Sequence, residues 1–210
     1  MNEILLTKKS KDIVENIVQT MEGQTFHHHF HILYDILTSI KKNHLKYLEI
    51  GSYCGASGSL VLSHQKKIDG FFIDTFSEAP ISMVMRNLEK YKNKDSQYKF
   101  IVGDSKSSEI ISETRRIVND VDLFYIDGEH SFEGCVSDFL NYVDLVSSGG
   151  YVVFDDYHDV YHSPQVKHAV DFIVSEYLFN QFEIIGTFRN SLSAKPTEMI
   201  FNNQYILRKK

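Results

Sequence analysis

Apolar residues recur at helical spacing in two segments near the start of the chain. In residues 11–21 and 30–40 they lie three or four positions apart. This spacing places them on one face of a helix. We therefore predict two helices before the first strand.

From Lys46 onward, short apolar runs of β type alternate with longer segments of helical spacing. The predicted strands are 46–50, 70–74, 98–102, 122–127 and 150–155. The predicted helices are 57–66, 79–92, 106–118 and 132–146, followed by one that opens with Ser163 as N-cap and Pro164 at the first helical position. This alternation is typical of βαβ units and predicts an α/β fold with a parallel sheet.

Two more β-type runs close the chain, at residues 182–188 and 198–207. The polar turn between them, RNSLSAKPT, leaves no room for a crossover helix, so we expect an antiparallel hairpin. The length of 210 residues, with 42% hydrophobic and 24% charged residues, is ordinary for one globular domain. Because no repeat or linker interrupts the pattern, we predict a single domain over residues 1–210.

Charge and cysteine usage narrow the class of partner and compartment. The net charge is −6 and no dense Lys/Arg stripe is present, which argues against a nucleic-acid partner. Cys54 and Cys135 are far apart and form no CxxC pair. No run approaches the roughly 18 apolar residues of a membrane span. We expect a reduced, cytoplasmic protein without a membrane partner.

The stretch LEIGSYCGASGS joins the first predicted strand to the next helix, where an open α/β sheet binds nucleotide-like ligands. Gly51 and Gly55 allow a tight turn and a close approach to a ligand. Tyr53 stands where the dinucleotide fingerprint GxGxxG has its middle glycine, so that fingerprint fails. Glu49, just before the loop, would repel a pyrophosphate but suits an ammonium group. Asp74, at the end of the second strand, could accept hydrogen bonds from two ribose hydroxyls.

Acidic residues also follow the fourth and fifth predicted strands, in YIDGEHSF and YVVFDDYHD. Adjacent parallel strands end at one edge of a sheet, so Asp127, Asp155 and Asp156 should meet there. Three crowded carboxylates repel one another unless a cation lies between them. Oxygen ligands without cysteine select a hard ion, so we expect Mg²⁺, with Mn²⁺ or Ca²⁺ as substitutes.

These motifs together carry a family resemblance. The succession LEIGSYCGAS, FFIDTF, IVGDS and DLFYIDGEHSFEGCVSDFLNYVDLVSSGGYVVFDDY resembles the class I S-adenosylmethionine-dependent methyltransferases. It is most similar to their metal-dependent O-methyltransferases of sugars and natural products, the macrocin and cephalosporin-tailoring type. The resemblance covers about residues 20–207 and is most specific over 122–157. It implies a Rossmann-like, seven-stranded, mostly parallel sheet with a C-terminal antiparallel hairpin and helices on both faces.

The resemblance also implies roles for the motif residues. Glu49, Gly51 and Gly55 would line the methionine end of S-adenosylmethionine, Asp74 would hold its ribose and Asp104 would lie by its adenine. Asp127, Asp155 and Asp156 match metal ligands of that family. The full set predicted to bind the cofactor is Glu49, Gly51, Ser52, Tyr53, Gly55, Ser57, Asp74, Asp104, Ser105 and Asp127.

A catalytic base is expected beside the acidic residues. His130 follows Asp127 by three positions, and its reference pKa near 6.5 suits proton abstraction from a hydroxyl. Glu129 is the alternative, because some relatives use an acid two residues after the first metal ligand. Both remain candidates from the sequence, and His130 is preferred.

Four histidines fall within TFHHHFH: His27, His28, His29 and His31. On a helix, His27 and His31 would be one turn apart, as in a two-histidine metal site, but no HExxH motif is present. Relatives have a similar segment that covers the cofactor. We therefore prefer a helical lid over residues 1–45, with Tyr34 and one of these histidines, preceding a catalytic core at 46–210.

The leading hypothesis is a methyltransferase that uses S-adenosylmethionine and Mg²⁺ to modify a hydroxyl of a sugar, a nucleotide sugar or a similar small polyol. A nicotinamide-dependent oxidoreductase is the alternative enzyme, since the glycine turn and Asp74 also permit it. A non-catalytic nucleotide-binding module is the third hypothesis. Relatives often self-associate, which makes a homodimer a candidate assembly.

Overall fold

The structure is a computed structural model that describes residues 8–23, 30–177, 180–187 and 204–210. It forms two compact units that divide after Asp104. The strands form a seven-stranded sheet in the order β3 (Gln97–Val102), β2 (Lys67–Asp74), β1 (His44–Ile50), β4 (Val121–Ile126), β5 (Val146–Phe154), β7 (Tyr205–Lys209) and β6 (Phe182–Thr187). The predicted α/β fold, mostly parallel with an antiparallel C-terminal hairpin, is confirmed. The extent of a single catalytic domain stays a prediction.

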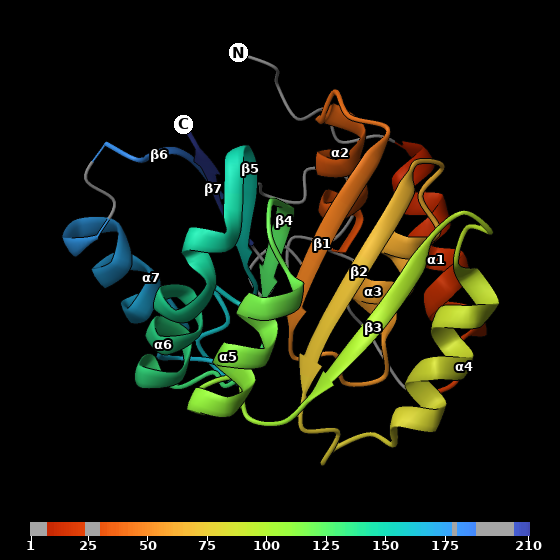
Figure 1. Cartoon of the computed structure of the whole chain (residues 1–210), viewed down its shortest axis with the longest axis horizontal. Helices are drawn as coiled ribbons and strands as arrows, with labels where there is room; N and C mark the ends of the chain where they lie inside the picture. The colour runs from red at the N-terminus through yellow and green to blue at the C-terminus, as the bar shows by residue number, and fades with distance from the viewer. Residues whose placement is uncertain (1–7, 24–29, 178–179, 188–203) are drawn as a thin grey trace. The chain divides into compact units, whose positions relative to one another are not determined.

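The first unit is built on three parallel strands, which Figure 1 shows side by side. They are β1 (His44–Ile50), β2 (Lys67–Asp74) and β3 (Gln97–Val102). Its helices are α1 (Lys8–Thr20), α2 (His31–Ser39), α3 (Ala56–Leu62) and α4 (Ile81–Tyr91). A Cβ on Gly58 of α3 would lie 2.5 Å from Cε1 of Phe72, which is fully buried in β2. This close approach fixes α3, and the loop before it, against the sheet.

Buried polar contacts hold α1 and α2 in the first unit. The Ser10 hydroxyl of α1 donates to Asp35 of α2 at 2.7 Å, and both residues are buried. The Lys66 ammonium group donates to the carbonyls of Leu37 and Ile40, at the C-terminal end of α2. Carbonyls at a helix C-terminus lack partners within the helix, so Lys66 caps α2.

His64 is a neutral histidine in the core of the first unit. Its side chain is fully buried, and its ring packs 4.4 Å from that of Tyr34. Nδ1 accepts from the Lys66 amide, and Nε2 lies 3.0 Å from the Thr38 hydroxyl, which donates to the Tyr34 carbonyl. Nε2 therefore carries the proton. Burial, and then the charges of Lys66 and Lys9, lower the pKa of His64 to about 4.

This buried histidine predicts a loss of stability in mild acid. A folded-state pKa below the unfolded value means that the unfolded chain binds more protons below pH 6.5, so stability falls as the pH drops through this range. His64 should make unfolding about 2 kcal/mol easier at pH 5 than at pH 7. Urea denaturation at both pH values measures the difference, and His64→Gln should reduce it. An unchanged pH dependence in His64→Gln would contradict this origin.

The second unit contains two parallel strands followed by two antiparallel ones. β4 (Val121–Ile126) pairs in parallel with β5 (Val146–Phe154), and β7 (Tyr205–Lys209) lies antiparallel between β5 and β6 (Phe182–Thr187). The helices are α5 (Ser108–Ile117), α6 (Phe132–Tyr142), the 3₁₀ turn η2 (Val143–Leu145) and α7 (Val166–Glu176). All six residues of β4 are buried. This burial holds the carboxyl end of β4, which Asp127 follows, in a fixed position within the unit.

Several boundaries differ from those predicted, among them the start of the last helix. α7 begins at Val166 rather than at Pro164, and Ser163 is not its N-cap. The Ser163 hydroxyl instead contacts His130 and Asp156. Of the last predicted strand, residues 198–203 lie outside the described residues, and β7 begins only at Tyr205. His27, His28 and His29 also lie outside the described residues.

Cys54 and Cys135 are both buried thiols that are not joined in a disulfide. Burial raises the pKa of the Cys135 thiol to about 12 and also raises that of Cys54, so neither is poised as a thiolate. Among the described helices, none has both the length and the apolar character needed to cross a membrane.

Candidate active site

The glycine loop runs from the end of β1 at Ile50 to the start of α3 at Ala56. Gly51 and Gly55 both have φ of +83°, in the left-handed region that favours glycine. A Cβ on Gly55 would lie 3.0 Å from Cγ1 of Val84. The loop therefore requires glycine at position 55 both for its backbone conformation and for its packing on α4.

Asp74 fixes the shape of this loop. Its Oδ2 accepts the amides of Ser52 at 2.6 Å and Tyr53 at 3.3 Å, and its Oδ1 accepts the amide of Phe76 at 2.6 Å. Tyr53 has φ of +44°, which is unusual for a residue with a side chain, and is 51% exposed at the tip of the loop. Asp74 thus holds a strained turn in place, while its predicted contact with ribose stays a prediction.

Glu49 and Ser52 are the buried polar groups at the start of the loop. Glu49 is fully buried, and its carboxylate accepts the hydroxyls of Ser57 at 2.5 Å and Tyr47 at 2.7 Å. Ser52 is 4% exposed, and its Oγ has no hydrogen-bond partner among the described residues. A buried hydroxyl of this kind has capacity left for a ligand. The loop therefore fits a cofactor with a polar amino-acid end.

Replacing Gly55 with alanine should destabilise the fold and weaken binding of S-adenosylhomocysteine. The left-handed φ costs about 1–2 kcal/mol for a residue with a Cβ, and the contact with Val84 adds to it. Gly149→Ala is the matched control, because Gly149 has φ of +81° and its Cβ would contact nothing within 4 Å. Denaturation should show the larger loss in Gly55→Ala, and calorimetry should show weaker binding there alone. Equal binding in both variants would contradict the role of the loop.

Asp104 and Ser105 follow β3 at the boundary between the two units. Asp104 is exposed. The Ser105 hydroxyl donates to Asp138 at 2.6 Å, and the Ser105 carbonyl accepts the hydroxyl of Tyr142 at 2.6 Å. The structure therefore uses the Ser105 side chain in a contact with α6, and its role toward a cofactor stays a prediction.

The acidic residues after β4 and β5 lie at paired strand ends. Ile126 and Phe154 are partners in the parallel register, and the Asp155 amide donates to the Ile126 carbonyl at 3.0 Å. Asp127 and Asp155 therefore follow neighbouring strands at one edge of the sheet. Asp156 comes next and adopts φ of +56°. This left-handed conformation is unusual for a residue with a side chain.

The structure gathers Asp127 and Asp156 with His130. One ligand atom from each lies within 4.8 Å of the others. Nε2 of His130 is 3.4 Å from Oδ1 of Asp127 and 3.6 Å from Oδ2 of Asp156. Asp155 is 4% exposed and lies outside this group. We call Asp127, His130 and Asp156 the carboxylate–histidine cluster.

The charges of the cluster favour a cation. Burial, and then the negative charge of Asp155, raise the pKa of Asp127 well above its usual range. The contact with Asp127 raises the pKa of His130 to about 9. Protons thus balance the crowded negative charge, and a dication is the other species that can do so. The donor set fits a metal such as Mg²⁺ or Mn²⁺, which Asp127 and Asp156 would hold.

Glu129, the alternative base, is engaged elsewhere. Its carboxylate accepts from the Lys106 ammonium group and from the Ser131 hydroxyl. The Lys106 contact, followed by that of Ser131, lowers the pKa of Glu129. A carboxylate held in this way is a weak base, so the geometry favours His130 for proton transfer.

The remaining candidates from the N-terminal segment lie inside the first unit. Tyr34 is 5% exposed and packs on His64, and His31 is 3% exposed. Tyr34 is therefore a core residue of α2. A residue of a lid would instead face a ligand. The lid function of residues 1–45 stays a prediction.

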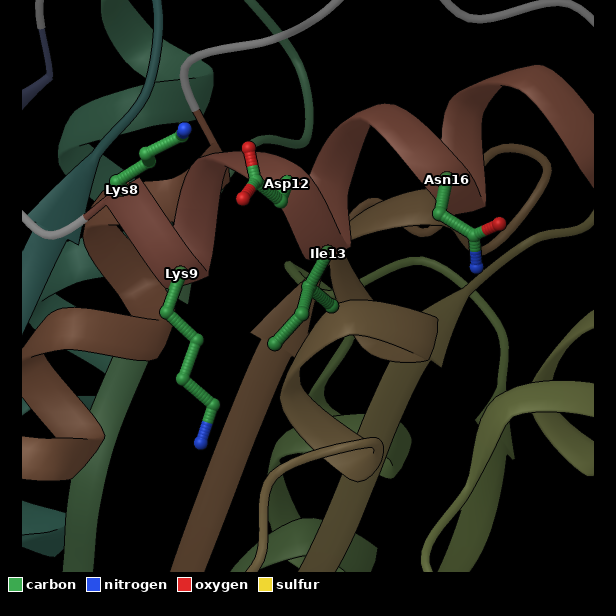
Figure 2. Close-up of a pocket in the computed structure, with 5 residues that line it drawn as sticks. All are labelled: Lys8, Lys9, Asp12, Ile13 and Asn16. Carbon is green, nitrogen blue, oxygen red and sulfur yellow. The ribbon is translucent and has the colours of Figure 1, made fainter.

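A pocket of about 450 Å³ lies along α1. Its lining side chains, drawn in Figure 2, are Lys8, Lys9, Asp12, Ile13 and Asn16. All five belong to the first three turns of that helix, and none is a predicted cofactor or metal residue. The pocket is lined by both positive and negative side chains, so its charge does not indicate a particular class of ligand.

Comparison with known proteins defines the class of the chain. A family model described as a methyltransferase domain matches residues 48–157, more than half of the chain. The chain therefore belongs to this methyltransferase family. It is also 34% identical to the uncharacterised protein R132 of Acanthamoeba polyphaga mimivirus, over 99% of this chain and 96% of that protein.

Solved structures share the fold at low identity. An O-methyltransferase from Bacillus cereus in complex with SAH has a TM-score of 0.59 and 13% identity, covering 97% of this chain and 92% of that one. An rRNA methylase from Streptococcus thermophilus has a TM-score of 0.61 and 12% identity, with 88% and 98% coverage. CalS11, a TDP-rhamnose 3'-O-methyltransferase of calicheamicin biosynthesis, has a TM-score of 0.56 and 14% identity, with 95% and 93% coverage. These likenesses support the fold and leave the acceptor open.

Proposed function

We propose that this methyltransferase moves a methyl group from S-adenosylmethionine to a hydroxyl of a sugar or similar small polyol, with help from Mg²⁺. The observation that carries the proposal is the carboxylate–histidine cluster at the ends of β4 and β5. A substrate that is already nucleophilic does not need a dication to activate it. It suits a hydroxyl acceptor, which needs activation.

The residues of the cluster divide the work between binding and proton transfer. Asp127 and Asp156 would hold the metal ion, and a bound dication would orient vicinal hydroxyls of the acceptor and make one of them more acidic. With the dication in place of the protons that balance the cluster, the ring of His130 would be neutral and would take the proton of that hydroxyl through Nε2. The acceptor oxygen then forms a bond to the methyl carbon as the carbon–sulfur bond breaks. The electron pair of that bond stays on sulfur, and S-adenosylhomocysteine is released.

The first unit would supply the cofactor site. Glu49 offers a buried carboxylate for the ammonium group of the methionine end, and Ser52 offers a buried hydroxyl. Asp74 holds the amides of the loop in the conformation that brings its backbone to a ligand. Gly55 keeps the entrance to α3 free of a side chain. These features support S-adenosylmethionine over a dinucleotide, whose pyrophosphate Glu49 would repel.

A sugar acceptor is supported by charge and by analogy. The net charge of −6 disfavours a polyanionic nucleic acid. One structure with the same fold carries the name of a TDP-rhamnose methyltransferase, and another that of an rRNA methylase. Both acceptor classes therefore belong in the test, and we expect the sugar.

Transfer of labelled methyl from S-adenosylmethionine to a panel of acceptors tests the proposal. The panel contains nucleotide sugars, free deoxysugars, catechol and ribosomal RNA, each with Mg²⁺ present. Label on a sugar hydroxyl supports the proposal, and label on RNA alone would overturn it. Calorimetry with S-adenosylhomocysteine and NAD runs beside it. Binding of NAD without binding of S-adenosylhomocysteine would return the chain to the oxidoreductase alternative.

A further inference from the structure

The loop that follows β5 is tied to the segment that carries His130. The Ser163 hydroxyl lies 2.8 Å from Nδ1 of His130. Two residues further on, the Gln165 side-chain carbonyl accepts the Phe132 amide at 2.8 Å, at the first residue of α6. These contacts join positions 33 residues apart in sequence. The loop at 157–165 is therefore a structural partner of the candidate base.

Asp159 folds this loop and places Ser163. Its Oδ1 accepts the amides of Tyr161 at 3.0 Å and His162 at 2.9 Å, and its Oδ2 lies 3.1 Å from Nδ1 of His162. The Ser163 amide donates to the Asp159 carbonyl at 3.2 Å. Ser163 itself is 1% exposed. Its hydroxyl is consequently held in one buried position.

The proton count at Ser163 determines the direction of both hydrogen bonds. Its Oγ lies 2.7 Å from Oδ2 of Asp156 and 2.8 Å from Nδ1 of His130. A hydroxyl has one proton to donate, and an ionised carboxylate can only accept. The Ser163 proton therefore goes to Asp156, and Oγ must accept from His130. Nδ1 of His130 is thus the nitrogen that carries a proton.

We propose that Ser163 is a positioning residue that accepts a hydrogen bond from Nδ1–H of His130 and so leaves Nε2, at the cluster, as the nitrogen that exchanges a proton. The positioning of His130 follows from the hydrogen bonds of Ser163. Its effect on catalysis rests on the proposed function. Nε2 is the nitrogen 3.4 Å from Asp127 and 3.6 Å from Asp156. A base whose lone pair points to that edge of the sheet can receive the proton of an acceptor held there. The opposite tautomer would present an N–H and could not.

Ser163→Ala should lower kcat by about 10- to 100-fold, as is usual when a residue that orients a functional group is lost. The KM for S-adenosylmethionine should stay unchanged, because the Ser163 hydroxyl is engaged with His130 and Asp156 of the cluster. Ser163→Thr keeps the hydroxyl and should restore most of the rate. Equal losses in the alanine and threonine variants would show a packing role and overturn the proposal.

The tautomer itself is the decisive readout, and it needs neither acceptor nor cofactor. Long-range ¹H–¹⁵N spectra of protein labelled at histidine nitrogens distinguish Nδ1–H from Nε2–H, and the signal lost in His130→Gln identifies His130. When the spectra are followed over a pH titration, wild-type protein should keep the proton on Nδ1 as the ring becomes neutral, and Ser163→Ala should show a mixture of tautomers. Nε2–H in wild-type protein, or the same tautomer in both, would overturn the proposal. Because this spectrum is independent of methyl transfer, failure of the proposed function would not change what the spectrum says about the tautomer.

Discussion

His130→Gln should reduce the rate of methyl transfer by about 10²- to 10⁴-fold, the usual contribution of a general base. Nε2 of His130 faces both Asp127 and Asp156, and glutamine has no atom at that place that can accept a proton at neutral pH. The affinity for S-adenosylhomocysteine should be unchanged, since the glycine loop is untouched. Single-turnover measurements at saturating cofactor isolate the affected step.

The control for this variant is His44→Gln. His44 is at the start of β1, its side chain is 49% exposed, and it contacts Asp69 at 2.8 Å. The same chemical change at that position should leave the rate within a factor of about two, in keeping with the small worth of exposed ion pairs. Glu129→Gln is the competing test, because Glu129 is the alternative base. A large loss in Glu129→Gln with little loss in His130→Gln would assign the proton transfer to Glu129.

Asp156→Asn should weaken metal binding by about 100-fold or more, because it removes a ligand where even supporting residues are worth 10- to 100-fold. Activity at a fixed Mg²⁺ concentration should fall accordingly. Asparagine tolerates the φ of +56° at this position, so the backbone turn is retained. Titration with Mn²⁺, followed by electron paramagnetic resonance, measures the loss of affinity without any turnover.

Asp120→Asn is the matched control for the aspartate variant. Asp120 also adopts a left-handed backbone, with φ of +52°, and it is exposed. It is not one of the residues that gather around His130. Mn²⁺ affinity in this variant should equal that of the wild type. Wild-type affinity in Asp156→Asn would remove Asp156 from the metal site and leave Asp155 as the candidate ligand.

Much of the fold could be predicted because local pattern and tertiary structure agree. The fully buried β4 is a continuous apolar run, and the alternation of such runs with helical segments predicts the parallel sheet. The start of α7 could not be predicted in the same way. Ser163 followed by Pro164 has the local signature of a helix start, but its hydroxyl is used by His130 and Asp156. A tertiary contact there overrides the local preference.

Only those site residues could be predicted that follow the ends of adjacent strands or lie a few positions from such a residue. Asp127 and Asp156 can be expected together because parallel strands end at one edge, and His130 because it follows Asp127 closely. The pairing of Glu129 with Lys106 joins residues 23 positions apart and leaves no mark in the local sequence. The left-handed φ of Asp156 likewise could not be predicted from the local sequence.

The rate of methyl transfer to the best sugar acceptor, measured over a range of free Mg²⁺ and again with excess chelator, tests the central claim most directly. The cluster of Asp127, Asp156 and His130 predicts a rate that saturates with Mg²⁺, collapses in chelator and returns when the ion is restored. An equal rate in chelator would contradict metal assistance and leave His130 to act alone.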